Sequence, residues 1–306
     1  MANARLTPRL ALLLTLPPLA WAGNAVVGRA LNDSVPPILL NTLRWSLALA
    51  LLLPLTRGLW AQRALWMQGW RWWLASGTLG MASYNALQYQ ALQTSGPVNV
   101  TLIAASLPVA MLVIGALFFH HRPTRGQLQG AVLCTLGVLV VVSQGQWQRL
   151  AQVQWVQGDV LMLLATLSWA GYSWLLTRPP RALGPDWPWT NTLALQMMVG
   201  LALGLPLSLL EQAWTPVTLQ ANWSVAAALL FIALGPSLLA YRCWGLGIAQ
   251  GGPALAAFFA NLTPLFAALM SAALLGEAPR AHHALAFVLI AAGISVSARR
   301  AAAGKP

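Results

Sequence analysis

The chain has 306 residues, of which 58% are hydrophobic and only 7% are charged, and its formal net charge is +12. Soluble domains carry about 25% charged residues, so this composition excludes a soluble enzyme or binding module and indicates an integral membrane protein. The basic residues are scattered between apolar runs, which argues against a nucleic-acid partner. They are typical of topology signals, and contact with anionic membrane lipid is a second interpretation of the same residues.

A helix needs about 20 apolar residues to span the hydrocarbon core of a membrane. Ten segments meet this requirement, and they cover residues 10–28, 36–55, 72–92, 97–119, 128–144, 158–177, 190–210, 224–248, 253–275 and 284–298. The first segment resembles a signal peptide, because Ala20, Trp21 and Ala22 precede Gly23. The triplet Trp-Ala-Gly returns at Trp169, however, so we expect residues 10–28 to be retained as the first helix of a repeated unit.

An internal repeat organises the chain. Residues 96–143 return 156 positions later without a gap, and the prolines and glycines are matched as Gly96 with Gly252, Pro97 with Pro253, Pro108 with Pro264, Pro123 with Pro279 and Gly137 with Gly293. Chance similarity between apolar stretches is the weaker explanation, since these residue types mark specific backbone positions. We therefore divide the chain into two five-helix units, residues 1–150 and 151–306.

An odd number of helices in each unit places the second unit upside down relative to the first. With a cytoplasmic N-terminus, three basic residues, Arg29, Arg149 and Arg280, lie on the outer side. Twelve lie on the inner side, namely Arg5, Arg9, Arg57, Arg63, Arg71, Arg122, Arg125, Arg178, Arg181, Arg299, Arg300 and Lys305. Basic residues favour the cytoplasmic side. We expect an all-α integral membrane fold of ten transmembrane helices in two inverted repeats, with both termini cytoplasmic, as in many secondary transporters.

Two prolines are candidates for a moving element. Pro108 and Pro264 lie near the middle of the fourth and ninth segments and occupy equivalent repeat positions. Each removes a backbone donor and frees the carbonyl of Ala104 or Ala260. The matched pair favours two bent helices that line a central path, and a packing kink is the alternative.

Polar and aromatic side chains deep in the apolar segments are candidates for a binding site. They are Trp21, Asn24, Tyr84, Gln88, Asn99, Trp169, Tyr172 and Asn261, with Ser106, Thr263 and Trp244 nearby in sequence. An apolar aromatic wall with a few polar groups suits an amphipathic small molecule. For any one of these residues, hydrogen bonding between helices is an equally good interpretation.

Arg44 is the strongest single candidate for a functional residue. It lies eight residues into the second segment, about 12 Å deep at about 1.5 Å per residue. An arginine at the membrane centre costs about 2.5–3.5 kcal/mol on insertion scales, so it should have a partner. The candidates are Asp159 and a carboxylate of the substrate, and snorkelling to the interface is the third interpretation. Arg242 lies near the cytoplasmic end of its segment, which favours snorkelling.

The acidic residues all lie at segment ends or in loops, so the sequence names no proton carrier, and proton coupling stays open. Clusters of His, Asp, Glu or Cys with catalytic or metal-binding spacing are missing from the sequence, and Cys134 and Cys243 show no disulfide pattern. We expect no enzyme activity, no cofactor and no metal. An integral-membrane enzyme and a lipid-handling protein remain the alternative classes.

The chain resembles the drug/metabolite transporter superfamily, in its ten-helix group with two EamA domains. The residues that carry this resemblance are Trp21 to Asn24, Arg44, Pro108, Gly158 with Asp159, Trp169 with Ala170, Pro264, and Leu275 to Glu277. The first repeat departs from the family pattern, because His120 and His121 stand where Gly-Glu is usual. The resemblance implies a small-metabolite or amino-acid transporter, often an exporter, and we expect a monomer or homodimer in the bacterial inner membrane. Its substrate would be a small metabolite, amino-acid-like and moved outward.

Overall fold

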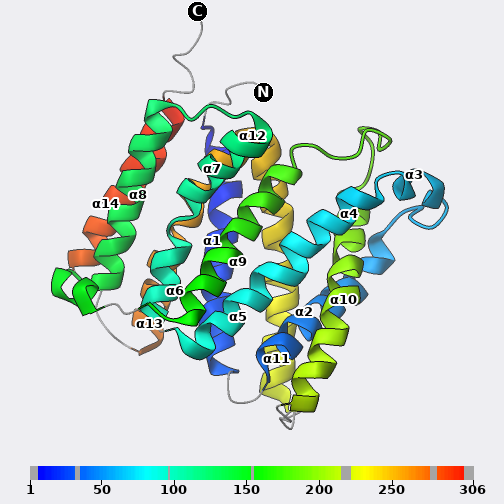
Figure 1. Cartoon of the computed structure of the whole chain (residues 1–306), viewed down its shortest axis with the longest axis horizontal. Coiled ribbons are helices and arrows are strands. Elements are labelled where there is room, and N and C mark those ends of the chain that lie inside the picture. Colours follow the sequence, from blue (N-terminus) through cyan, green and yellow to red (C-terminus); the bar gives the residue numbers. More distant parts are fainter. Residues whose placement is uncertain are drawn as a thin grey trace, which may run out of the picture.

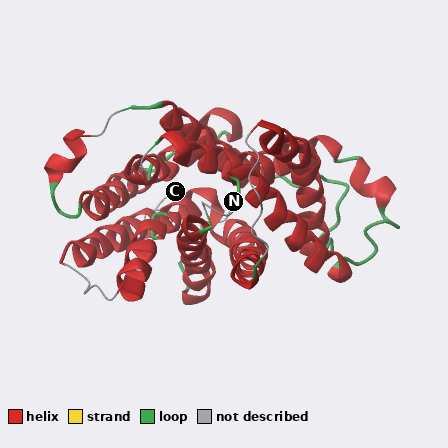
Figure 2. Cartoon of the chain, turned by 90° about the horizontal axis from the view of Figure 1, so that it is seen from below, coloured by secondary structure: helices red, strands yellow, loops and turns green. Residues whose placement is uncertain are grey.

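A computed structural model describes residues 6–31, 35–95, 97–152, 155–214, 222–275 and 281–299. Several residues used above, including Gly96, Gly276, Glu277, Pro279 and Arg280, lie outside the described residues. Within the described ranges, every regular element is helical (Figures 1 and 2). The first predicted helix begins and the last one ends at the same end of the bundle (Figure 1).

The elements follow one another in two sets. The first set comprises α1 (Pro8–Ala30), α2 (Pro37–Leu52), η1 (Leu53–Leu55), α3 (Arg63–Met67), α4 (Trp70–Gly77), η2 (Thr78–Ser83), α5 (Tyr84–Thr94), α6 (Pro97–Ala104), α7 (Leu107–Phe119), α8 (Arg125–Ser143) and η3 (Trp147–Gln152). The second set comprises α9 (Gln157–Leu175), α10 (Trp189–Trp214), α11 (Trp223–Ile232), η4 (Ala233–Leu239), α12 (Ala240–Ala260), α13 (Thr263–Leu275) and α14 (Ala281–Arg299).

Seven helical stretches of the described chain are long and apolar enough to cross a membrane. One of them, Trp223–Ala260, has 38 residues, nearly twice the length of one crossing. It contains a break at Gly252, whose φ of 81° and ψ of 161° are not helical. Glycine adopts this backbone conformation without the steric cost that other residues would have. The expected segment 253–275 is not among the seven as a separate span, because only its first residues fall within Trp223–Ala260. The expected segments 72–92 over α4–η2–α5 and 158–177 over α9 are not among them either. These helices carry many of the polar side chains of the bundle interior, which lowers their hydropathy.

Each set contains one π-helical segment, and the two segments occupy equivalent positions. Residues 78–83 of η2 fall on residues 234–239 of η4 at the repeat distance of 156. A π-helical turn inserts an extra residue and leaves carbonyls outside the normal helical pattern. Side chains from neighbouring helices bond to them: Ser168 Oγ donates to Leu79 O at 2.8 Å, and Trp21 Nε1 donates to Pro236 O at 3.2 Å. In both cases the donor belongs to the opposite repeat.

Both proline-containing segments are interrupted near their middle. The first break separates α6 from α7, and the second separates α12 from α13. Pro108 and Pro264 each lie at the second position of the helix that follows the break. The last residues before the breaks are Ala104 and Ala260, whose carbonyls the prolines leave without their usual donor. The bend predicted from the sequence is therefore present, and its role in transport stays a prediction.

α8 and α14 pack side by side through small residues (Figure 1). A Cβ added at Gly137 would lie 2.7 Å from Ile290 and 3.0 Å from the Ala286 carbonyl oxygen. A Cβ added at Gly293 would lie 2.6 Å from Cys134 Sγ and 2.8 Å from the Gly130 carbonyl oxygen. Glycine at these positions lets the two backbones approach closely, as is common between membrane helices.

Candidate functional site

Arg44 lies buried in the middle of the bundle, with only 1% of its surface exposed. Its Nε donates to Ser237 Oγ at 3.0 Å, and its Nη1 donates to Asn85 Oδ1 at 3.0 Å. The guanidinium also lies 4.8 Å from the ring centroid of Trp45. All of these partners are neutral. In the part of the chain that the structure describes, no carboxylate pairs with Arg44, and its Nη2 has no hydrogen bond.

Asp159, which the sequence offered as a partner for Arg44, is bonded elsewhere. It is 1% exposed and accepts hydrogen bonds from Ser95 Oγ, from Asn99 Nδ2 at 3.2 Å and from the Val156 backbone N–H at 2.9 Å. These bonds connect the start of α9 to the α5–α6 connection. Asp159 therefore has a structural role at one end of the bundle, and the interpretation that it neutralises Arg44 is not supported by the geometry.

Seven aromatic side chains form one group around Trp169, here called the aromatic cluster: Trp21, Trp45, Tyr84, Trp169, Tyr172, Tyr241 and Trp244. The ring of Trp169 lies 5.0 to 5.5 Å from the rings of five of them. Trp45 joins through Tyr241, at 5.0 Å between centroids. Since Arg44 lies over Trp45 and within electrostatic range of Tyr84 and Tyr241, the cation lies at the edge of the cluster.

Hydrogen bonds hold several rings of the cluster in place, and two of these bonds go to backbone carbonyls of the π-helical segment η2. Tyr241 Oη donates to Gly80 O at 2.8 Å, and Trp45 Nε1 donates to Met81 O at 3.0 Å. Trp244 Nε1 donates to Ser173 Oγ at 3.1 Å. A buried aromatic ring with a satisfied polar atom is fixed in orientation, so these rings present faces and edges to the interior and keep their N–H and O–H groups occupied.

The predicted site residues divide into two groups. Trp21, Arg44, Tyr84, Trp169 and Tyr172 come together as described, and Gln88 interacts with the Tyr84 hydroxyl. The others lie elsewhere. Asn99 bonds to Asp159, and Asn261 Nδ2 donates to the Ala105 carbonyl oxygen at 3.3 Å beside the second helix break. Asn24 Nδ2 lies 3.4 Å from Tyr89 Oη, while its buried Oδ1 has no hydrogen-bond partner.

A cavity of about 400 Å³ lies next to the aromatic cluster. It is formed by α4, the α9–α10 connection, α10 and α12, at the end of the bundle where α1 begins (Figure 1). We call it the aromatic vestibule. Its lining includes Trp72, Trp73, Tyr172, Trp187, Trp189, Gln196, Tyr241 and Arg242. The vestibule and the aromatic cluster share Tyr172 and Tyr241, so the two are continuous.

Comparison with known proteins shows the relatives of this chain. The EamA-like transporter family matches residues 9–143 and again residues 156–299. The chain belongs to this family. The repeat read from the sequence is therefore the repeat of the family, and the expected superfamily is confirmed.

Full-length relatives of this EamA-like transporter include an uncharacterized transporter of Archaeoglobus fulgidus, 26% identical over 92% of this chain and 95% of its own. An aromatic amino acid exporter, YddG, of Ancylobacter novellus is 23% identical over 91% of this chain and 93% of its own. A crystal structure with 21% identity covers 95% of this chain and 98% of its own with a TM-score of 0.74, which shows the same fold.

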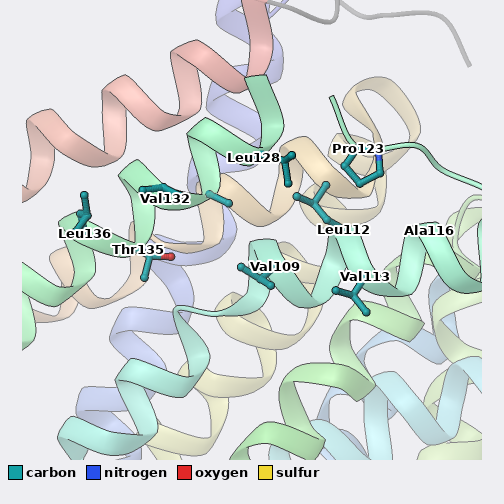
Figure 3. Close-up of a pocket in the computed structure, with 10 residues that line it drawn as sticks. Val109, Leu112, Val113, Ala116, Pro123, Leu128, Val132, Thr135 and Leu136 are labelled. Atoms are coloured by element: carbon teal, nitrogen blue, oxygen red, sulfur yellow. The ribbon is translucent and has the colours of Figure 1, made fainter. Parts of the chain in front are cut away.

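A second cavity of this transporter has a different character. It has a volume of about 470 Å³ and lies between α7 and α8, where Val109, Leu112 and Val113 face Leu128 and Val132 (Figure 3). Val109, Val113, Leu128 and Val132 are about half exposed. Thr135 supplies the one labelled side-chain oxygen in this groove. An open apolar surface of this kind suits a lipid chain and lacks the polar groups that orient a metabolite.

Sequence reasoning missed several residues of the site. Asn85, Ser237 and Tyr241 contact or surround Arg44 but carry no motif of their own. The sequence contains one signal for them, because Tyr241 occupies in the second repeat the position that Asn85 occupies in the first, 156 residues earlier. Among the described residues, no group of three His, Cys, Asp or Glu side chains could hold a metal ion.

Proposed function

We propose that this chain is a secondary transporter that binds a small amphipathic carboxylate, amino-acid-like in size, at Arg44 and moves it outward by alternating access. The observation that carries the proposal is the buried guanidinium of Arg44, whose hydrogen-bond partners are the neutral groups of Asn85 and Ser237. A buried cation without a counter-ion is unfavourable, so a ligand carboxylate would supply the missing charge. Arginine binds carboxylates through two parallel N–H groups, and Nη2 is available for this contact.

The aromatic cluster supports an amphipathic ligand. Trp45, Tyr84 and Tyr241 lie around Arg44, so a bound carboxylate would have aromatic faces next to its apolar part. Small-molecule sites combine such an apolar wall with a few fixed polar groups. The name of the Ancylobacter novellus relative, an aromatic amino acid exporter, agrees with this substrate class and with export.

For the membrane arrangement we propose ten crossing segments in two inverted repeats divided near residue 150, in a bacterial inner membrane. The helical stretches α4–η2–α5 and α9, and the stretch from Pro253 of α12 through α13 with its break, would supply the crossings that hydropathy alone does not indicate. The end of the bundle at which α1 begins carries exposed Arg57, Arg63, Arg71 and Arg181, and we assign it to the cytoplasm. Pro108 and Pro264 would allow the two broken helices to bend during the transition. Efflux measured with and without a pH gradient tests proton coupling, and the mass of the purified protein in detergent distinguishes a monomer from a homodimer.

The test is transport by purified protein in liposomes. Vesicles loaded with radiolabelled L-phenylalanine, L-leucine or L-glutamate would be diluted and sampled for loss of label, with and without a pH gradient. We expect efflux of at least one apolar amino acid from vesicles with wild-type protein, and efflux at the protein-free rate with Arg44→Gln. Wild-type rates in a well-folded Arg44→Gln protein would overturn the role of Arg44, and efflux of no carboxylate would overturn the substrate class.

A further inference from the structure

The aromatic vestibule contains two polar groups that no neighbour satisfies. Gln196 is 1% exposed, and its buried Nε2 has no hydrogen-bond partner. Its Oε1 lies 3.5 Å from Tyr172 Oη, which donates to it and holds the amide in this orientation. A buried, unpaired N–H donor is costly, so its presence in a cavity wall indicates that the cavity receives an acceptor group.

Arg242 is the second of these groups, and its side chain is partly exposed. It lines the same cavity, and its guanidinium lies 4.8 Å from the ring centroid of Trp189. It makes no hydrogen bond or ion pair with any residue that the structure describes. Snorkelling toward the cytoplasmic end stays the expectation for this partly exposed residue, and the stacking on Trp189 places its head group against the cavity wall. A guanidinium stacked on a ring keeps its N–H edges free for an anion.

The remaining wall presents aromatic surface and few free polar atoms. The indole nitrogen of Trp72 donates to Leu175 O at 3.1 Å, that of Trp73 donates to Trp66 O at 2.8 Å, and that of Trp187 donates to Thr192 Oγ1 at 3.0 Å. With these groups occupied, the rings can offer their faces and edges to a ligand. Among the described residues, none of those that line the cavity is acidic. The donors of Arg242 and Gln196 therefore favour a ligand with a negatively charged acceptor group, and the aromatic rings favour a ligand with an apolar part.

From these observations we infer that the aromatic vestibule is a second binding site, which takes an aromatic carboxylate through Arg242 and Gln196 before the ligand reaches Arg44. The inference rests on the proposed function and deepens it. Tyr172 and Tyr241 form part of both the vestibule and the aromatic cluster, so a ligand held at Arg242 contacts the rings that separate it from Arg44. The vestibule lies at the end of the bundle assigned to the cytoplasm, where an exported molecule would enter.

The experiment places a reactive probe in the vestibule. Leu183→Cys would be introduced in a variant in which Cys134 and Cys243 are replaced by alanine, since Leu183 lines the cavity and lies on the α9–α10 connection. The rate of maleimide labelling would be measured in nanodiscs with increasing L-phenylalanine or L-tryptophan, and with the corresponding carboxamides. We expect both amino acids to slow the labelling and the carboxamides to need about tenfold higher concentrations, because they lack the charged acceptor.

Two further variants separate the sites. Arg44→Gln should abolish transport but keep the protection of Leu183→Cys, while Arg242→Gln should raise the protecting concentration about tenfold. Arg71→Gln is the matched control, because Arg71 is exposed and stacks on Trp70 at 5.4 Å outside the vestibule. Protection that is lost with Arg44→Gln but unchanged with Arg242→Gln would overturn the second site and leave the proposed function intact. Absence of protection by either amino acid in the parent variant would also overturn it.

Discussion

Asn261 donates a hydrogen bond to the carbonyl oxygen of Ala105, the residue that occupies its own position in the other repeat, 156 residues earlier. The same relationship joins Cys134 and Ile290, which are also 156 residues apart, through a 3.7 Å contact from Sγ to the carbonyl oxygen. Two equivalent positions can touch only close to the axis that relates the repeats. Both contacts therefore mark the pseudo-two-fold axis, one at the break between α12 and α13 and one between α8 and α14.

The proline breaks lie beside this axis, which leads to the first prediction. Pro108→Ala or Pro264→Ala restores a backbone donor and favours a straight helix, so transport should fall several-fold while thermal stability stays equal or rises. Efflux from liposomes and a thermal unfolding curve measure the two effects. Unchanged efflux in both variants would show that the prolines serve helix packing and not transport.

The second prediction concerns the charge of Arg44. Asn85→Asp would place a carboxylate where the amide oxygen now lies, 3.0 Å from Nη1. An internal counter-ion should satisfy the guanidinium and compete with a substrate carboxylate, so we expect a folded protein of equal or higher stability that no longer binds substrate. Equilibrium binding of labelled L-phenylalanine measures the loss. Arg44→Lys should retain part of the binding, because lysine keeps the charge without the planar fork. Full binding by Asn85→Asp would argue that the substrate is bound elsewhere.

Asp159 provides the third prediction. Asp159→Asn weakens the bonds to Ser95, Asn99 and the Val156 N–H, and we expect it to lower the free energy of unfolding by about 1–3 kcal/mol. The double variant with Arg44→Gln should show additive losses, since the two residues share no partner. Thermal unfolding in detergent measures both. Recovery of stability in the double variant would instead reveal a charge pair between them.

The fourth prediction tests the contact between α8 and α14. Gly137→Ala would bring a methyl group to 2.7 Å from Ile290 and 3.0 Å from a backbone oxygen, so we expect a loss of about 1–3 kcal/mol of stability. Gly245→Ala is the control, because no atom lies within 4 Å of an added Cβ there and alanine favours helix. The melting temperature should fall for the first variant and stay equal or rise for the second. Equal melting temperatures would show that α8 and α14 move apart easily.

The fifth prediction concerns topology. Single cysteines in the variant without Cys134 and Cys243 should react with an impermeant maleimide from outside intact cells at Gln146 and Ala213. Cysteines at Gln62 and Arg181 should react only after the cells are opened. All four residues are exposed, so accessibility in the folded protein does not limit the reaction. Labelling of Arg181→Cys in intact cells would contradict the inverted arrangement.

The sequence was sufficient to predict the repeat and the two proline breaks, because Pro108 and Pro264 act locally on the backbone, but it did not predict the further break at Gly252. It also indicated part of the site, since Trp21 and Trp169 repeat and Arg44 is costly wherever it lies in a membrane. The partners of Arg44 could not be predicted, because Asn85 and Ser237 meet it from helices distant in sequence. The same reason explains Asp159, whose partner Ser95 lies in a short connection of the other repeat. The π-helical segment η2 was missed because the stretch over Thr78–Ser83 contains no proline and has the composition of an ordinary helix, and η4 was missed although it contains Pro236.

The contact between α8 and α14 has a mechanical consequence. When two halves of a molecule exchange conformations about an axis, points on the axis move least, and Cys134 and Ile290 lie there. This seam can act as a fulcrum: it stays closed, as does the contact between Asn261 and Ala105, while the parts of the broken helices farther from the axis and the rings around Trp169 rearrange. The seam would then carry the mechanical load between the repeats without blocking the substrate path.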